Sequence, residues 1–341
     1  MKRNRQTLPL LLLLLAVSLS SCEKEISFNG TVTAPRPVMN GILTPGSAVS
    51  LHLSRSRFVL GEQTPLSPIS DATVSLSVND APLGGPLIHF GEGTYMGSYT
   101  PKAGDRIKIE VTAGGFGKFT AQTLIPKKPV VTVTDSTVTL EREEGAYGQI
   151  EYRRMKVQLK LTDAAAEENY YYIKATQYFY HDGNPAGEYA LELEIADILK
   201  NNISDGGNLF DDLFDDGEER YYRTKNLFSD RFVNGKEILF DFMYQDVLND
   251  DVIYGNGNAT GDGDATGDGD GVDGPGRETE YVIEIGEITK DLYLYLISGE
   301  RFERTWESPI SEPVLIHSNI ENGIGILGSC NTYRFTSRFQ R

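Results

Sequence analysis

The chain has 341 residues, and its 49 acidic residues outnumber 32 basic ones, which gives a formal net charge of −17. A surface of that charge repels nucleic acid and anionic lipid headgroups, so neither is expected to bind the folded surface. A chain of this length is expected to form two domains, each with a hydrophobic core of its own.

The first residues have the layout of an export signal. The basic opening MKRNR precedes an apolar run from Leu8 to Val17, which is shorter than the roughly 20 residues of a membrane-spanning helix. The sequence LSSC at 19–22 then resembles the lipobox at which bacterial lipoprotein signals are cut. Residues 1–21 are therefore predicted to be a lipoprotein signal peptide, and Cys22 is predicted to carry the membrane-anchoring lipid. The alternative is a soluble export signal with a cysteine at the cleavage point.

Residues 22–36 are predicted to be a lipidated N-terminal tether. With Cys22 bound to lipid, Cys330 is the one remaining cysteine, so no intramolecular disulfide is expected. From Pro37 onward apolar and polar residues alternate, as in VSLHLSRSRFVL, ATVSLSVND and DRIKIEVTAG. A period of two with frequent Gly, Pro, Asn and Asp predicts short antiparallel strands. Residues 37–126 are therefore expected to form a β-sandwich-like domain of the immunoglobulin or transthyretin kind.

Residues 127–341 are predicted to be a second, larger β-sandwich-like domain, after the linker IPKKPVV at 125–131. Its strand candidates include VVTVTDSTVTL, YRRMKVQLKLTD, NYYYIKATQYFYHDG, YALELEIADIL, GKEILFDFMY and TEYVIEIGEI. A packed helix is predicted at Lys290–Arg304, with Thr289 as its cap. Its apolar stripe consists of Leu292, Tyr295, Leu296 and Phe302.

Shorter patterns predict local geometry. Asn-Gly at 40–41, 234–235 and 322–323 predicts turns with positive φ, and Gly-Ile-Gly-Ile at 323–326 predicts a strand that another backbone approaches closely. The aromatic runs at 170–172, 178–180 and 221–222 are each expected to expose one ring that could stack on a sugar or peptide. The alternative is that these tyrosines only suit half-buried strands.

Residues 255–276 contain a Gly/Asp repeat that is predicted to be a disordered loop. One register of the repeat matches the ligand spacing of a calcium loop, with Asp262, Asp264, Thr266, Asp268, Asp270 and Asp273 as the oxygen ligands. The last ligand is Asp where a bidentate Glu is expected, and Pro275 prevents a helix from following at once. A solvated spacer is the favoured interpretation, and weak calcium binding is the alternative. No other cofactor is expected.

No catalytic motif stands out. The four histidines, His52, His89, His181 and His317, lack metal-ligand spacing, and the chain has neither a Gly-x-Ser-x-Gly elbow nor a phosphate-binding glycine loop. Acidic residues are so abundant that a pair suited to glycoside hydrolysis carries no information. The protein is therefore expected not to be an enzyme.

Several phrases, taken in order, resemble one family of outer-membrane lipoproteins of Bacteroidota, which is classed as domain of unknown function 4249. The phrases are PVMNG at 37–41, HLSRSR at 52–57, DATV at 71–74, FSD at 228–230, NGKE at 234–237, TKDLY at 289–293, EPV at 312–314 and SNIENGIGI at 318–326. The resemblance covers nearly the whole chain after the predicted signal peptide.

The resemblance implies a location and a setting. Such proteins are typically found beside TonB-dependent outer-membrane receptors, which implies a non-enzymatic accessory role in ligand uptake or signalling. The alternative is a surface lipoprotein that binds a glycan or peptide independently of a receptor. The charged stretch Glu23-Lys24-Glu25 resembles a surface-export signal of this phylum, so both the periplasmic face and the cell surface remain open.

Overall fold

The computed structural model describes residues 33–57, 66–145, 148–191, 226–248, 277–306 and 314–340. Within these ranges the chain forms sixteen strands, the helix α5 and the short 3-10 helix η2 (Asp230–Phe232). The prediction of a mainly β protein with at least one packed helix is therefore confirmed. No helix in the described ranges is long and apolar enough to cross a membrane.

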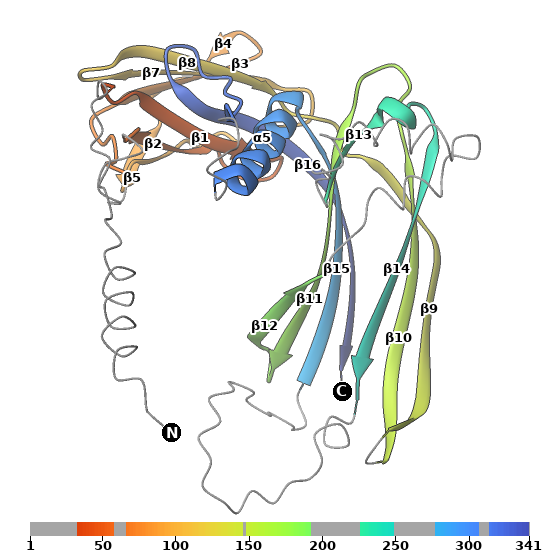
Figure 1. Ribbon diagram of the computed structural model, residues 1–341. Coiled ribbons are helices and arrows are strands. Elements are labelled where there is room, and N and C mark those ends of the chain that lie inside the picture. Colours follow the sequence, from red (N-terminus) through yellow and green to blue (C-terminus); the bar gives the residue numbers. More distant parts are fainter. Residues whose placement is uncertain are drawn as a thin grey trace, which may run out of the picture.

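Strands from the first part of the chain form two facing layers (Figure 1). One layer has the order β4-β3-β7-β8, and β1-β2-β6-β5 form the end of a larger sheet. Val74, Ile109 and Leu53 are among the side chains buried between the layers, as the period of two predicts. The strands are β1 (Pro37–Leu43), β2 (Ser50–Arg55), β3 (Thr73–Val78), β4 (Ala81–Pro82), β5 (Ile88–Gly91), β6 (Thr94–Met96), β7 (Arg106–Ala113) and β8 (Gly117–Leu124).

Longer strands form a second sandwich. The sheet β14-β10-β9 packs against β12-β11-β15-β16, and β13 pairs with β11. Leu159, Phe240 and Ile283 are fully buried in the core between these sheets. The strands are β9 (Val130–Gly145), β10 (Gly148–Thr162), β11 (Tyr170–His181), β12 (Asn184–Ala190), β13 (Leu227–Ser229), β14 (Glu237–Val247), β15 (Arg277–Ile288) and β16 (Ile324–Gln340).

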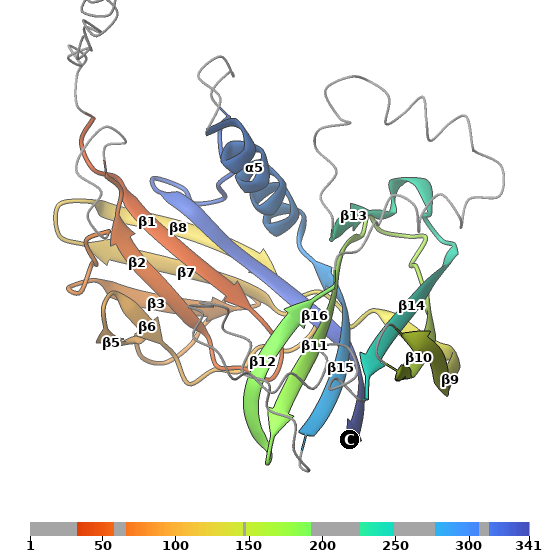
Figure 2. The ribbon, with the colours of Figure 1, turned by 60° about the horizontal axis from the view of Figure 1, so that its bottom comes forward.

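The last strand joins the two halves. The first part of β16 pairs in parallel with β1, from Val38 opposite Ile324 to Leu43 opposite Ser329, and the rest of β16 pairs antiparallel with β15. One nine-stranded sheet therefore runs through both sandwiches (Figure 2). The predicted second domain, 127–341, includes residues that belong to the first sandwich. Ile320 and Leu327 lie within these bounds but are buried in the core of the first sandwich.

Helix α5 (Lys290–Trp306) begins where the sequence predicts and packs against β16 and β11. Leu292 is buried beside Ile326, and Tyr295 and Leu296 are partly buried against the same cluster. Thr289 occupies the predicted N-cap position, because its carbonyl oxygen accepts a hydrogen bond from the Tyr293 amide at 2.9 Å. Its hydroxyl accepts a hydrogen bond from the Ser329 amide at 3.4 Å, which ties the helix start to β16.

The predicted Asn-Gly turns have mixed outcomes. Gly235 (φ 69°) and Asn322 (φ 60°) adopt positive φ, as predicted. The prediction is wrong for residues 40–41, which lie inside β1. A Cβ on Gly41 would lie 3.3 Å from that of Leu51, so the glycine serves side-chain packing there. The prediction for Gly325 (φ 111°) is confirmed, because a Cβ on it would overlap the carbonyl oxygen of Met39.

Candidate functional site

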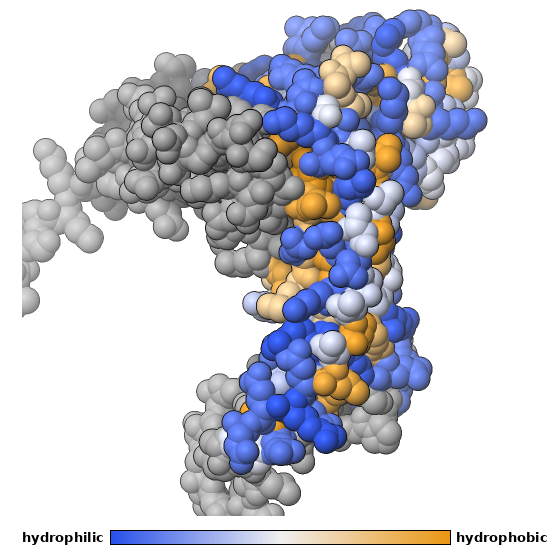
Figure 3. Space-filling model, turned by 90° about the vertical axis from the view of Figure 1, so that its right-hand side faces the viewer, coloured by the Kyte–Doolittle hydropathy of each residue, from blue (hydrophilic) through white to orange (hydrophobic). Residues whose placement is uncertain are grey.

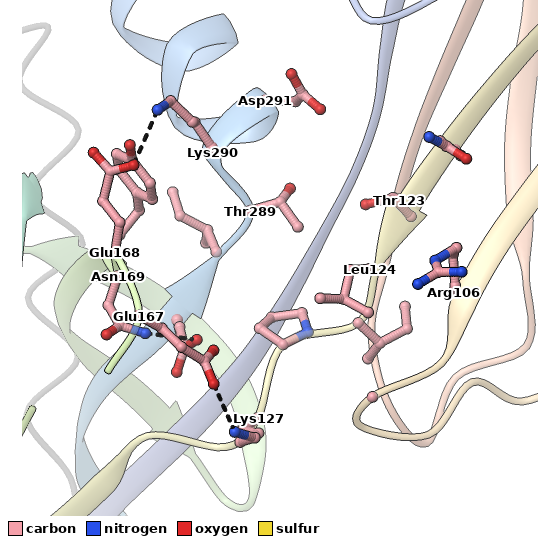
Figure 4. Close-up of a pocket in the computed structure, with 17 residues that line it drawn as sticks. Arg106, Thr123, Leu124, Lys127, Glu167, Glu168, Asn169, Thr289, Lys290 and Asp291 are labelled. Atoms are coloured by element: carbon pink, nitrogen blue, oxygen red, sulfur yellow. Dashed lines mark hydrogen bonds and ion pairs between the residues drawn. The ribbon is translucent and has the colours of Figure 1, made fainter. Parts of the chain in front are cut away.

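A cavity of about 410 Å³ lies where the two sandwiches meet (Figure 4). Its wall combines the end of β8 and the linker after it, the loop before β11, the end of β15 and the first turn of α5. Parts of the chain more than 150 residues apart thus meet because β16 holds the two sandwiches in one sheet. The charged side chains of the wall are Arg106, Lys127, Glu167, Glu168, Glu287, Lys290 and Asp291.

Two ion pairs cross the rim of this junction cavity. Lys127 contacts Glu167 at 3.1 Å, and Lys290 contacts Glu168 at 3.0 Å. The hydrogen bond from Lys290 lowers the pKa of Glu168, and the same contact raises the pKa of Lys290. All four side chains are largely exposed, so these pairs contribute little to stability and are free to exchange partners with a ligand.

The inner wall of the junction cavity is built on Asn169, which is 4% exposed. Its backbone N–H donates to Asp230 at 2.9 Å, and its side-chain N–H donates to Glu287 at 3.2 Å. Burial raises the pKa of Glu287, and the bond from Asn169 opposes that rise. Burial also raises the pKa of Asp230. The side-chain oxygen of Asn169 is buried and has no hydrogen-bond partner among the described residues.

An aromatic group supports the cavity from the side of the helix. The ring of Tyr170 lies 4.7 Å from that of Tyr293, and the Lys290 ammonium lies 5.8 Å from the Tyr170 ring. Charged groups of both signs, an amide and an aromatic ring are the groups that bind polar ligands such as glycans and peptides.

The calcium prediction and the lipidation prediction fall outside the described residues. The residues concerned are Cys22, Asp262, Asp264, Thr266, Asp268, Asp270 and Asp273, so calcium binding and lipidation remain predictions from the sequence. In the part of the chain that the structure describes, no three His, Cys, Asp or Glu side chains are placed to hold a metal ion.

The expectation that each aromatic run exposes a ring is wrong for the first run. Tyr170 and Tyr171 are 6% and 2% exposed, and the half-buried Tyr172 bonds Thr332 through its hydroxyl at 2.7 Å. In the second run the ring of Tyr180 lies under the Arg338 guanidinium at 4.4 Å. The run at 221–222 lies outside the described residues. The tyrosines of the first run therefore serve packing, which was the alternative interpretation.

The sequence did not single out Asn169 or Glu287. The sequence offers one signal for this part of the site, the polar triplet Glu167-Glu168-Asn169 directly before an aromatic strand. The triplet indicates that polar groups gather at the start of that strand. Nothing local indicates that residues 122–127 and 287–291 would lie opposite that triplet.

A separate apolar group is exposed on the first sandwich, on β5, away from the junction cavity (Figure 1). Strand β5 is an edge strand of the nine-stranded sheet. Its side chains Ile88 and Phe90 are 66% and 69% exposed. Ile88 lies opposite the half-buried Met96 of β6, while the intervening His89 packs against the buried Tyr95 ring at 5.0 Å. Exposed apolar side chains gathered on one strand face are typical of protein contact surfaces.

Comparison with known proteins gives a family and no assigned activity. No curated protein matches the chain. A solved structure from Corynebacterium diphtheriae, provisionally described as a membrane-anchored protein, shares 12% identity with a TM-score of 0.20, over 75% of this chain and 55% of that one. The model of the family described as domain of unknown function (DUF4249) matches residues 23–336. The chain therefore belongs to the DUF4249 family.

Proposed function

We propose that the protein is a non-enzymatic lipoprotein of the outer membrane that assists a TonB-dependent receptor in ligand uptake or signalling. Cys22 carries the lipid anchor, and residues 22–36 form the tether to β1. The observation that carries the proposal is the pair of exposed apolar side chains Ile88 and Phe90 beside the half-buried Met96, because such a group is suited to binding another protein. The class of partner comes from the family resemblance.

The continuous sheet supports this role. Because β16 pairs with both β1 and β15, a contact made by β5 is held in a fixed orientation relative to the junction cavity. A rigid body loses little conformational entropy when it binds, so most of the contact energy is available for affinity.

Co-purification of the detergent-solubilised full chain tests the proposal. A TonB-dependent receptor is expected to co-purify with the wild type and to be lost with the Ile88→Asp, Phe90→Asp double variant. Met243→Asp is the matched control, because Met243 is 62% exposed on a different strand, β14. Absence of any such receptor from the wild-type preparation would contradict the proposal.

The second candidate is a glycan- or peptide-binding lipoprotein that works independently of a receptor. The buried, unpartnered oxygen of Asn169 in the wall of the junction cavity favours it, because a ligand N–H or O–H could satisfy that oxygen. Thermal-shift measurements with oligosaccharides and short peptides on the full chain would detect such a ligand. Asn169→Ala should remove the shift, and the exposed Asn184→Ala should keep it.

A further inference from the structure

Strand β9 leaves one edge open. It is a 16-residue strand at the end of the sheet β14-β10-β9, and no strand in the described ranges pairs with its outer side. A row of backbone N–H and C=O groups therefore points outward. Residues 130–140, VVTVTDSTVTL, carry a single charge at Asp135 and contain neither lysine nor proline, the residues that protect natural sheet edges.

Strand β9 also carries exposed apolar side chains on the face of the sheet that covers the second core. Val133 lies opposite Leu159 and Val138 lies opposite Met155, and both partners are buried in the second core. Val133 and Val138 are nevertheless 43% and 47% exposed, and Leu140 is 74% exposed. Figure 3 shows apolar residues in a broken band along the side of the molecule that carries these long strands. An apolar face beside an open strand edge favours the addition of another strand.

A bulge aligns this apolar face. Residues five apart on a regular strand point to opposite faces. The register between β9 and β10 shifts by one residue at Gln158 and Leu159, and this shift places Val133 and Val138 on the same face.

The edge is complementary to itself. If β9 pairs antiparallel with another β9 so that Val133 lies opposite Val138, then Thr132 lies opposite Thr139 and Val131 opposite Leu140. Each apolar residue of the core face meets an apolar residue, and threonine meets threonine on the other face. Such cross-strand pairs are the unit of sheet stabilisation.

Charges flanking the apolar segment fit the same register. Lys128 stands two residues before β9 and falls opposite Glu143 when the same count is continued past Pro129. Both residues are exposed. A two-fold axis produces this pair twice, and the acidic end of one strand meets the basic entry of the other.

We propose that β9 is the interface between two copies of this chain, which pair antiparallel through their β9 edges with Val133 opposite Val138. The two three-stranded sheets then become one six-stranded sheet, and the apolar residues of the core face line it on one side. This inference does not depend on the receptor or on the junction cavity.

Thiol cross-linking of the full chain tests the register. In a Cys330→Ser background, a short bifunctional cross-linker should join two copies of the Val133→Cys, Val138→Cys double variant. Either single variant should give no dimer, because the bulge leaves like positions four pairing steps apart, or about 13 Å, across the axis. Absence of a covalent dimer from the folded double variant would overturn the proposal. Cross-linking to another protein instead would overturn it too, since the edge would then serve a different chain.

Charge reversal gives a second test that leaves the apolar residues in place. Lys128→Glu or Glu143→Lys should each weaken dimerisation of the solubilised full chain by about tenfold in sedimentation equilibrium. The combined variant should restore it, since residue 128 of one copy faces residue 143 of the other. Lys128 also contacts the Tyr333 ring at 5.6 Å within one copy, but Glu143→Lys cannot restore that contact.

Two further results complete the test. Met243→Lys, on the opposite edge strand of the same sheet, should leave the dimer unchanged. The β9 variants should still co-purify with the receptor. Loss of dimerisation can therefore be distinguished from loss of the proposed receptor contact. A wild-type chain that stays monomeric at every concentration, or a combined variant that fails to recover, would contradict the β9 interface.

Discussion

Gly325 pairs with Met39 across the parallel junction of β16 and β1, 286 residues apart in the chain. The φ of Gly325 is 111°, and a Cβ there would overlap the Met39 carbonyl oxygen. The two sandwiches therefore share one sheet only as long as this position has no side chain.

Gly325→Ala should lower the free energy of unfolding by about 3 kcal/mol or more, from backbone strain and steric overlap together. Urea denaturation followed by tryptophan fluorescence measures the loss. Gly187→Ala is the matched control, because a Cβ at this strand position meets no atom within 4 Å. Equal effects of the two variants would show that the junction tolerates a side chain.

Asp105 should make the first sandwich sensitive to acid. Its carboxylate accepts hydrogen bonds from the Tyr99 hydroxyl at 2.6 Å, the Lys102 amide at 2.8 Å and the Asn79 amide at 3.2 Å. Burial works in the opposite direction, but these bonds hold the pKa of Asp105 below its ordinary value of 3.8. The stabilisation is therefore complete above that value and is lost as the pH falls through the lowered pKa.

Asp105→Asn should cost about 1–3 kcal/mol at pH 7, since hydrogen bonds to a charged group are lost. The difference from the wild type should shrink as the pH falls below 3.8. Asp80→Asn provides the comparison, because the Asp80 side chain is 82% exposed and should change stability little. Denaturation at several pH values would reveal a pH-independent difference if Asp105 were not the cause.

Substitution of Glu287 should change stability at neutral pH in the opposite direction to substitution of Asp105. Burial raises the pKa of Glu287 in the folded protein, so its charged form costs stability at neutral pH. Glu287→Gln should therefore unfold at a higher denaturant concentration than the wild type at pH 7. The two midpoints should converge as the pH falls through the raised pKa towards the ordinary value of 4.5. A midpoint difference that widens on acidification would contradict this reading of the cavity wall.

Two buried tyrosines of one core should respond differently to loss of the hydroxyl. Tyr171 donates to the Asp163 carboxylate at 2.7 Å, whereas the Tyr244 hydroxyl is buried without a partner among the described residues. Tyr171→Phe should cost about 1–3 kcal/mol, and Tyr244→Phe should be neutral or stabilising. Thermal unfolding of both variants provides the comparison, and equal losses would contradict the hydrogen-bond assignment.

Local patterns predict most of the elements. The alternation in DRIKIEVTAG corresponds to β7, and the stripe through Leu292 corresponds to α5. The pairing of β1 with β16 could not be predicted in this way, because it depends on two strands at opposite ends of the chain. For the same reason Asn40-Gly41 has the sequence of a turn but lies in a strand, where Leu327 packs against Gly41.

The residues of the candidate site are even harder to predict from local sequence patterns. Charged and polar residues are common in this chain, and only the fold selects Asn169, Glu287 and Lys290 from among them. The aromatic run at 170–172 was noticeable in the sequence, but its rings are needed against α5 and in the second core.

Mass spectrometry of the N-terminal peptide of the native protein is the decisive experiment, because both proposed functions require a chain that is held at a membrane through Cys22. We expect a peptide that starts at Cys22, with a diacylglycerol thioether on sulfur and an acyl chain on the amino group. We also expect that Cys22→Ala releases the protein from the membrane fraction. An unmodified Cys22 thiol, or a peptide that continues upstream of residue 22, would contradict the proposed lipid anchor.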